Sequence, residues 1–226
     1  SFFSKYDLKE KRYFITVNNM IGIVDYNAGN IKSVERALTA LGISYVISKN
    51  PEDLKDCSKL IFPGVGEAAY AMDQLKKSGF DVFLRNWVKE SKPLLGICLG
   101  SQIIFEYSEE GDTQCLGFIK GKIRHFNSLD DSMVKKGIKI PHMGWNNITE
   151  QNGGSKILAN VPKDSDFYFV HSYVICPEDK SVVKATADYE IQVPAVIQCG
   201  NIYACQFHPE KSGEKGMMIL RNFCED

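Results

Sequence analysis

Between residues 20 and 105, short apolar runs alternate with amphipathic stretches, and this alternation limits the possible folds more than any other feature. Strand-like runs occupy 20–25, 43–47, 59–62 and 93–98. Apolar residues recur at helical spacing over 31–41, 67–77 and 80–90, and a further helix is expected to begin near Leu99. Asn30 stands at the N-cap position of the first helix, and Gly42 follows its end. This order predicts a largely parallel sheet with helices on both faces.

The second half of the chain has a different character. Its apolar runs are rich in β-branched and aromatic residues, and Gly, Pro, Asn and Asp separate them. They lie at 117–126, 166–175, 181–187, 194–199 and 201–207. Such runs indicate additional antiparallel strands, either on the same sheet or beside it. The tail, 214–224, has helical spacing.

Residues 1–19 differ from the rest of the chain in their sequence pattern. They mix aromatic and charged residues and lack the continuous apolar stretch of a signal peptide. We interpret them as a leader or an appended remnant outside the core. With no internal repeat and no long linker after them, residues 20–226 are expected to form a single domain.

Composition excludes several classes of protein. The chain has 226 residues, 44% of them hydrophobic, with 27 basic and 28 acidic residues and a net charge of −1. Charge balance argues against a nucleic-acid-binding surface, and the hydrophobic fraction argues against disorder. No uninterrupted apolar run approaches the roughly 18 residues that a membrane span needs.

Seven cysteines are scattered along the chain without a C-x-x-C pair. They lie at positions 57, 98, 115, 176, 199, 205 and 224. An odd, scattered set fits a reducing compartment better than a disulfide framework. The cysteines therefore lead us to expect a cytoplasmic protein. The four histidines show no ligand-like spacing, so we expect no metal or other cofactor.

Cys98 lies in Gly-Ile-Cys-Leu-Gly (96–100), between a predicted strand and a predicted helix. This is the setting of a nucleophile elbow, in which flanking glycines allow a sharp turn that exposes the central side chain. A helix N-terminus favours a thiolate there, and the N–H of Leu99 would point toward a developing oxyanion. The alternative is a buried structural cysteine with glycines in the adjoining turns.

His208-Pro209-Glu210 could supply the base that a thiolate nucleophile needs. Proline favours an extended conformation of the residue before it, and residues i and i+2 of an extended segment project to the same side. Glu210 could then orient His208 toward Cys98 in a Cys-His-acid triad. A surface turn is the alternative for such a tripeptide taken alone.

The two motifs, taken as GICLGSQ (96–102) and QFHPEKS (206–212), resemble those of the class I glutamine amidotransferases. A third stretch, PGVG (63–66), shares the resemblance. The resemblance implies a flavodoxin-like α/β fold and the release of ammonia from glutamine through a glutamyl thioester. It implies Cys98 as nucleophile, His208 as acid and base, and Glu210 as the orienting group.

The same resemblance implies a set of glutamine-binding residues. These are Gly64, Gln102, His171, Ser172 and Tyr173. Gln102 lies one helical turn after Cys98 and could face the same pocket. An ordinary polar helix residue is the alternative for Gln102, and a satisfied core or edge histidine is the alternative for His171.

Val65 departs from the Pro-Gly-Gly sequence that many class I glutaminases carry in this loop. Val65 and Leu99 are the expected oxyanion-hole donors. Valine resists the positive φ that glycine accepts, so we expect the resting loop to direct a carbonyl rather than an N–H toward the substrate. A partner would then be needed to turn the peptide. The alternative is a simple turn after a strand.

Three further stretches narrow the resemblance to glutaminase subunits of imidazole glycerol phosphate synthases, which serve histidine biosynthesis. They are DYNAGNIKSVERAL (25–38), PHMGWN (141–146) and YFVHSY (168–173). That family implies a heterodimer with a (β/α)8 cyclase that receives the ammonia and makes imidazole glycerol phosphate and an aminoimidazole carboxamide ribotide. Asn30, Trp145 and Lys211 match positions at or near the subunit contact, although a core position is the alternative for Trp145.

Other functions remain open from the sequence. A paralogous glutaminase could supply ammonia for amidino-sugar formation in surface-polysaccharide synthesis, and Ser101 is one mild departure that leaves this open. A non-catalytic binding protein on the same scaffold would lack the nucleophile or the base, and both are present. A different elbow-cysteine hydrolase would not require the distant His208-Pro209-Glu210.

Overall fold

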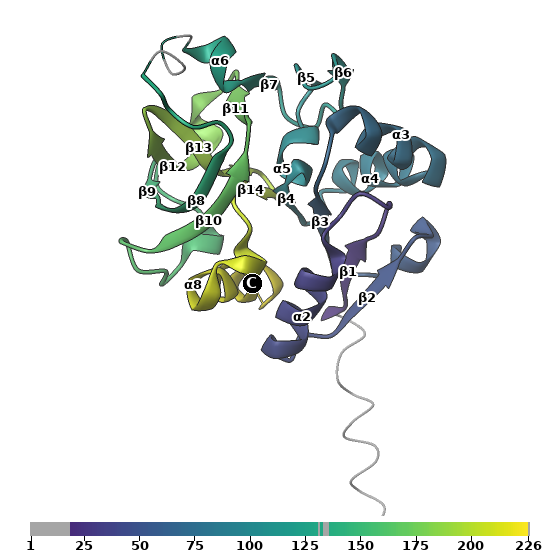
Figure 1. Cartoon of the computed structure of the whole chain (residues 1–226). Helices are drawn as coiled ribbons and strands as arrows, with labels where there is room; N and C mark the ends of the chain where they lie inside the picture. Colours follow the sequence, from purple (N-terminus) through teal and green to yellow (C-terminus); the bar gives the residue numbers. More distant parts are fainter. Residues whose placement is uncertain (1–18, 131, 133–135, 226) are drawn as a thin grey trace, which may run out of the picture.

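The computed structural model describes residues 19–130, 132 and 136–225. Its largest feature is an eight-stranded sheet with strand order β2-β1-β3-β4-β14-β13-β12-β9 (Figure 1). Five neighbouring strands run parallel: β2 (Tyr45–Ser48), β1 (Ile21–Val24), β3 (Lys59–Gly64), β4 (Leu94–Cys98) and β14 (Ile202–Cys205). The remaining three are antiparallel: β13 (Ile191–Cys199), β12 (Val183–Tyr189) and β9 (Thr149–Glu150). The predicted mainly parallel, mixed sheet is confirmed.

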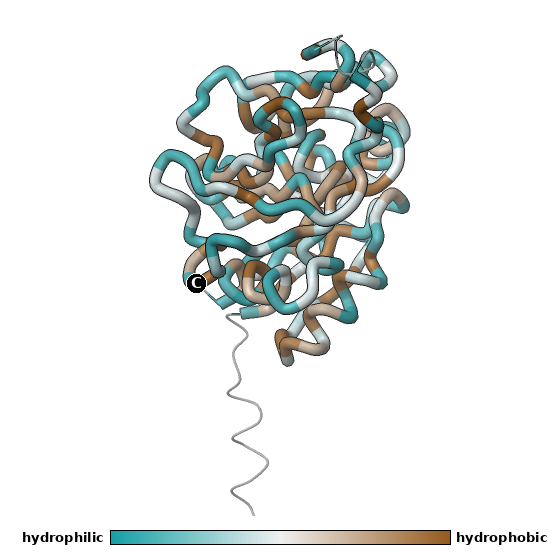
Figure 2. The backbone as a smooth tube through the Cα atoms, turned by 60° about the vertical axis from the view of Figure 1, so that its left-hand side comes forward, coloured by the Kyte–Doolittle hydropathy of each residue, from teal (hydrophilic) through white to brown (hydrophobic). Residues whose placement is uncertain are grey.

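Helices cover both faces of the parallel part of the sheet, as the sequence predicts. On one face lie α2 (Ile31–Leu41) and α8 (Gly213–Glu225), and on the other lie α3 (Ala68–Ser78) and α4 (Phe80–Lys89). Successive residues of a strand point to opposite faces. On β3, Ile61 joins the core beneath α2 and α8, whereas Leu60 and Phe62 join the core beneath α3 and α4. Figure 2 shows that many outer loops are hydrophilic, in contrast to this apolar interior.

Two smaller sheets lie beside the main one, so the additional strands of the second half occur both on the main sheet and next to it. One pairs β8 (His142–Asn147) with β10 (Asp166–His171), and the other has the order β11-β7-β5-β6. Its strands are β11 (Tyr173–Pro177), β7 (Gly121–His125), β5 (Tyr107–Ser108) and β6 (Thr113–Gln114). The run predicted at 166–175 is therefore two strands, which separate at Ser172 and join different sheets.

The remaining elements are short. They are α5 (Leu99–Ile103), α6 (Phe126–Leu129), and the 3₁₀ helices η2 (Pro51–Leu54), η3 (Lys156–Leu158), η4 (Lys180–Val182) and η5 (Pro209–Lys211). None of the helices in the described part of the chain is both long and apolar enough to cross a bilayer. The prediction for the leader falls on residues 1–18, which lie outside the described residues, and on Asn19.

Both predicted ends of α2 are in place, but only one caps as expected. Gly42 adopts a left-handed conformation with φ 69°, and its N–H donates to the carbonyls of Leu38 and Thr39. Asn30 occupies the N-cap position without a side-chain bond to the backbone of the first turn. Its Oδ1 instead accepts from the Ser33 hydroxyl at 3.2 Å, so Ser33 competes for the oxygen that the cap would use.

Candidate active site

The carboxyl ends of β3, β4 and β14 lie side by side at one edge of the sheet. Gly64 at the end of β3 is in register with Cys98 at the end of β4, and Cys205 of β14 is in register with Ile97. Ligands of open α/β sheets bind at this edge. A cavity of about 340 Å³ opens here, lined by Val65, Gly66, Cys98, Leu99, Gln102, Glu110, Pro141, Val170, His171, Ser172, Tyr173, His208 and Lys211.

Cys98 lies at a sharp turn between β4 and α5. Its φ of 53° and ψ of −111° are strained for a residue with a side chain. A Cβ atom on Gly96 would lie 2.7 Å from the Gly100 carbonyl oxygen, and one on Gly100 would overlap the Phe62 carbonyl. Both flanking glycines are therefore required for the elbow, and the predicted strand-turn-helix setting is present.

Helix α5 begins at Leu99, as predicted, and has only five residues. A helix of this length has a weak macrodipole, because the dipole grows with the number of aligned peptide units. The Cys98 sulfur lies 3.9 Å from the Val170 carbonyl oxygen, and the ring of His208, whose pKa Cys98 raises, lines the same cavity.

His208 and Glu210 meet, as predicted, but not by the predicted route. His208 is extended with φ −100° and ψ 94°, whereas Glu210 lies in the 3₁₀ turn η5, so strand alternation does not bring them together. The turn places Glu210 Oε1 2.7 Å from His208 Nδ1, and both side chains are almost fully buried. Because Nδ1 is taken by Glu210, Nε2 is the nitrogen available to Cys98.

The charge state of His208 follows from its neighbours. Burial alone would lower the pKa of His208. The hydrogen-bonding and charge effects of Cys98 and Glu210 outweigh burial and raise this pKa to about 9. An imidazolium between a sulfur and a carboxylate stabilises a thiolate. His208 is therefore held in a position to offer a proton at the cavity that Cys98 also lines.

In a nuclear magnetic resonance titration of the labelled full chain, the His208 ring is expected to titrate near pH 9. In Cys98→Ala the His208 pKa is expected to fall, because the hydrogen bond and the charge of the sulfur are lost. Burial lowers the pKa of His142 to about 4 and that of His171 to about 3, so the signals of these two rings do not change near pH 9.

The variant His125→Gln identifies the fourth histidine signal in this titration. The raised folded-state pKa also stabilises the folded chain at pH values below about 6.5, the ordinary histidine value, and this contribution is lost as the pH rises through about 9. A His208 midpoint near 6.5 in the unmodified chain would contradict the proposed ion pair.

Gln102 lies in the cavity wall, but its amide hydrogens face the protein. Its Nε2 donates to the Tyr173 carbonyl at 3.1 Å and to Gln206 Oε1 at 2.9 Å. Only its Oε1 is left to accept from a ligand. The predicted site residue is therefore in place, and its contact with substrate would be through an acceptor.

His171 belongs to a buried network instead of offering a free nitrogen to the cavity. Its Nδ1 is 2.7 Å from the Tyr173 carbonyl, and its Nε2 is 3.0 Å from His142 Nδ1. Asn146 Nδ2 lies 3.3 Å from the other nitrogen of His142. His171 is thus a satisfied buried histidine that also lines the cavity, and contacts with a ligand along 171–173 would come from the backbone and the other side chains.

The loop after β3 shows the orientation that Val65 leads us to expect. The Val65 N–H donates to the Ala28 carbonyl at 2.8 Å and so points away from the cavity. Because the peptide is planar and trans, the Gly64 carbonyl points in the opposite direction. Val65 lines the cavity, whereas Gly64 is buried against Leu99 and Gly100.

Glu110 is a cavity residue that the sequence reasoning missed. One of its carboxylate oxygens accepts from the Ala68 N–H at 2.9 Å, which fixes the side chain at the start of α3. Burial raises the pKa of this carboxyl group, against the lowering effect of the Ala68 hydrogen bond. Glu110 lies in a short loop with no motif of its own, so no sequence signal marks it.

The predicted contact residues are not all at the cavity. Lys211 lines it, but Asn30 and Trp145 do not. Trp145 is 59% exposed on β8, which excludes a core position for this side chain. Its ring packs edge-on against Tyr168, with centroids 6.0 Å apart, and Tyr168 in turn lies 6.4 Å from the His208 ring. Trp145 therefore borders the site without entering it.

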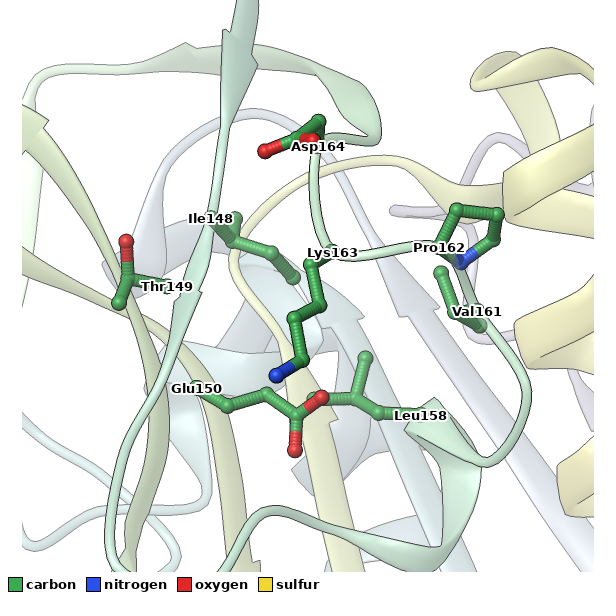
Figure 3. A pocket seen from close by; sticks show the side chains of 8 residues that line it. All are labelled: Ile148, Thr149, Glu150, Leu158, Val161, Pro162, Lys163 and Asp164. Atoms are coloured by element: carbon green, nitrogen blue, oxygen red, sulfur yellow. The ribbon is translucent and has the colours of Figure 1, made fainter.

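A second cavity, of about 270 Å³, lies between the edge strand β9 and the loop 161–164. Figure 3 shows Glu150 and Lys163 at its opening and the apolar side chains Ile148 and Leu158 behind them. It contains no cysteine or histidine. The chemistry is therefore assigned to the cavity at Cys98. Among the described residues, no group of three or more His, Cys, Asp or Glu could hold a metal ion.

The elbow cysteine, the buried histidine–glutamate pair and the mixed sheet define a hydrolase of the class I glutamine amidotransferase fold. The model of the family described as "Glutamine amidotransferase class-I" matches residues 22–226. Among solved structures, one titled as a glutamine amidotransferase has a TM-score of 0.70 at 20% identity, covering 91% of this chain and 97% of that one. PurLQS from Thermotoga maritima has a TM-score of 0.69 at 18% identity, with the same coverage. These two likenesses show the fold.

Curated relatives define the family more narrowly. The imidazole glycerol phosphate synthase subunit HisH of Halalkalibacterium halodurans is 45% identical over 207 residues, which is 90% of this chain and 94% of the relative. HisH of Nitratidesulfovibrio vulgaris is 44% identical over 204 residues, covering 90% of this chain and 95% of the relative. The chain belongs to the class I glutamine amidotransferases and, within them, to the family of HisH subunits.

Proposed function

We propose that the chain hydrolyses glutamine to glutamate and ammonia as the glutaminase subunit of imidazole glycerol phosphate synthase. The observation that carries this proposal is the strained elbow of Cys98 at a cavity where the buried His208–Glu210 pair also lies. Family membership supports the same activity.

The reaction follows from these groups. The Cys98 thiolate attacks the side-chain carboxamide carbon of glutamine, and His208 gives its Nε2 proton to the departing ammonia. The product on the enzyme is a glutamyl thioester. A water molecule then attacks the thioester while His208 accepts a proton, glutamate leaves, and the thiolate is restored. Glu210 holds the imidazole in orientation throughout.

Charge in the cavity fits the amino-acid part of the substrate. Glutamine carries an α-ammonium group, and Glu110 supplies a fixed carboxylate in the cavity wall. Its hydrogen bond with Ala68 leaves one carboxylate oxygen for that ammonium. Glu110 is therefore the residue we assign to binding the α-amino group, together with the acceptor Oε1 of Gln102.

The occupied Val65 N–H supports a glutaminase that depends on a partner. With this donor held by Ala28, the Leu99 N–H remains as the expected donor to the tetrahedral oxyanion. A partner that favours rotation of the Gly64–Val65 peptide would complete the hole. Ammonia would then be released when an acceptor subunit is bound.

The relatives are named as subunits of imidazole glycerol phosphate synthase, and we assign a cyclase with a (β/α)8 barrel as the partner here. The docking face that we assign to it comprises Val65, Met143, Trp145 and Lys211. Met143 and Trp145 are 60% and 59% exposed on the same side of β8, and Val65 and Lys211 lie at the cavity. Exposed large apolar side chains beside an active site are typical of an interface.

Trp145→Ala is expected to weaken binding of the cyclase by about 30-fold or more, because a truncated tryptophan anchor at the centre of an interface costs about 2 kcal/mol or more. Isothermal titration calorimetry with the cognate cyclase measures this change. Val82→Ala is the matched control, since Val82 is also 59% exposed but lies on α4, across the molecule from β8. Equal affinity of Trp145→Ala and the unmodified chain would remove Trp145 from the docking face.

The function is tested by mixing the chain with its cognate cyclase and the histidine-pathway ribonucleotide, with either glutamine or ammonia as the nitrogen source. Product is expected from both sources. If intact subunits give no product from the ribonucleotide with either source, the histidine-pathway assignment fails. A sugar acceptor would then be tested, as for the polysaccharide paralogue.

A further inference from the structure

Tyr26, two residues after the end of β1, carries a buried hydroxyl group that the mechanism above does not use. The residue is fully buried, and its Oη has no hydrogen-bond partner among the described residues. An unpaired buried polar group is costly, and such groups are uncommon in folded proteins. The position of this hydroxyl is therefore informative.

The Tyr26 hydroxyl lies beside the loop that contains Val65. A Cβ atom on Gly64 would be only 2.7 Å from Tyr26 Oη, so the hydroxyl sits directly against Gly64. The Tyr26 ring is held by Phe62, with ring centroids 5.2 Å apart. Two residues further on, Ala28 accepts the Val65 N–H. One short segment thus places both an acceptor and an unused donor next to the Gly64–Val65 peptide.

Rotation of the Gly64–Val65 peptide would exchange the directions in which its N–H and its carbonyl point, so each group would need a new hydrogen-bond partner. In the present orientation the Val65 N–H is paired with Ala28, and the Gly64 carbonyl points the opposite way. After rotation the N–H faces the cavity, and the carbonyl faces the segment 26–28. There it meets the Ala28 carbonyl, which cannot donate, so the rotated state needs a hydrogen-bond donor from this segment.

We propose that the Tyr26 hydroxyl is a positioning group that donates to the Gly64 carbonyl when the peptide rotates to complete the oxyanion hole. This inference rests on the proposed glutaminase function and names a residue that stabilises its active state. The hydroxyl is unpaired in the resting state because its acceptor arrives only on rotation. Burial raises the pKa of Tyr26 well above its usual range, with a further contribution from Cys98, so the group keeps its proton.

The test compares Tyr26→Phe with the unmodified chain, each in complex with the cyclase. Tyr26→Phe is expected to lower the kcat for glutamine hydrolysis about fivefold to tenfold, the effect of one neutral hydrogen bond, and to leave the KM for glutamine unchanged. The Tm of the isolated chain is expected not to fall, because the hydroxyl has no partner to lose. A merely structural hydroxyl would instead lower the Tm. Tyr45→Phe is the control, since its hydroxyl contacts Thr39 on the surface.

A second measurement separates Tyr26 from a direct effect on Cys98. The rate of Cys98 alkylation by iodoacetamide reports the thiolate and needs no oxyanion hole, so it is expected to be the same in both proteins. Unchanged kcat in Tyr26→Phe, or a lower kcat with equally slower alkylation, would overturn the proposal. Absence of glutaminase activity in the unmodified complex would instead refute the proposed function.

Discussion

Cys98→Ala is expected to abolish glutamine-dependent product formation by the two-subunit enzyme while ammonia-dependent formation continues. Loss of the nucleophile removes the thioester route altogether, and the expected decrease in glutamine hydrolysis is at least about 10⁴-fold. Ammonia bypasses the glutaminase, because the acceptor reaction takes place on the partner. Product formation from each nitrogen source, measured side by side, gives the result.

The substitution is expected to leave the fold intact. Alanine has a Cβ like cysteine, so the strained φ of 53° is neither relieved nor worsened. Cys199→Ala, at the end of β13, is the matched control and should retain both activities. Glutamine-dependent product from Cys98→Ala at more than a trace level would show that another group is the nucleophile.

Val65→Gly is expected to raise the glutaminase rate of the isolated chain by about 10- to 100-fold. One oxyanion donor is worth about 10²–10³ in kcat, and glycine permits the rotated peptide that valine resists. The rate of the complex should change little, because its partner already favours the rotated state. Stimulation by the cyclase is therefore expected to fall, as measured by glutamate release with and without the cyclase.

Val65→Ala is the matched control for this experiment. It shortens the side chain but keeps a Cβ atom, and with it the resistance to positive φ. Its basal rate should stay near that of the unmodified chain. If alanine and glycine raise the basal rate equally, side-chain bulk rather than peptide rotation limits the resting enzyme.

The part of the fold that the sequence predicts is the part with strong periodicity. Strands β1, β3 and β4 are buried on both faces, and α2, α3 and α4 have one apolar face, so local pattern determines each of them. The small sheets are different. β5 and β6 have two residues each, and the pairing of β8 with β10 depends on contacts between distant segments. Local periodicity cannot predict such pairings.

The same distinction holds at the site. Cys98, His208 and Glu210 lie in short motifs whose chemistry can be inferred from neighbouring residues. Glu110 reaches the cavity only because its loop meets the start of α3, and Ala28 matters only because its carbonyl lies against the Val65 N–H. These contacts join loops that are far apart in the sequence. Their residue types alone do not indicate a role.

The buried network behind the cavity has a fixed direction. A carbonyl oxygen can only accept, so Tyr173 requires the proton of His171 to be on Nδ1. His171 Nε2 must then accept from His142 Nδ1, and His142 Nε2 must accept from Asn146. One backbone carbonyl thus determines the tautomers of two neutral rings. The network therefore fixes the orientation of the His171 ring, the one of these side chains that lines the cavity, without offering a ligand a donor of its own.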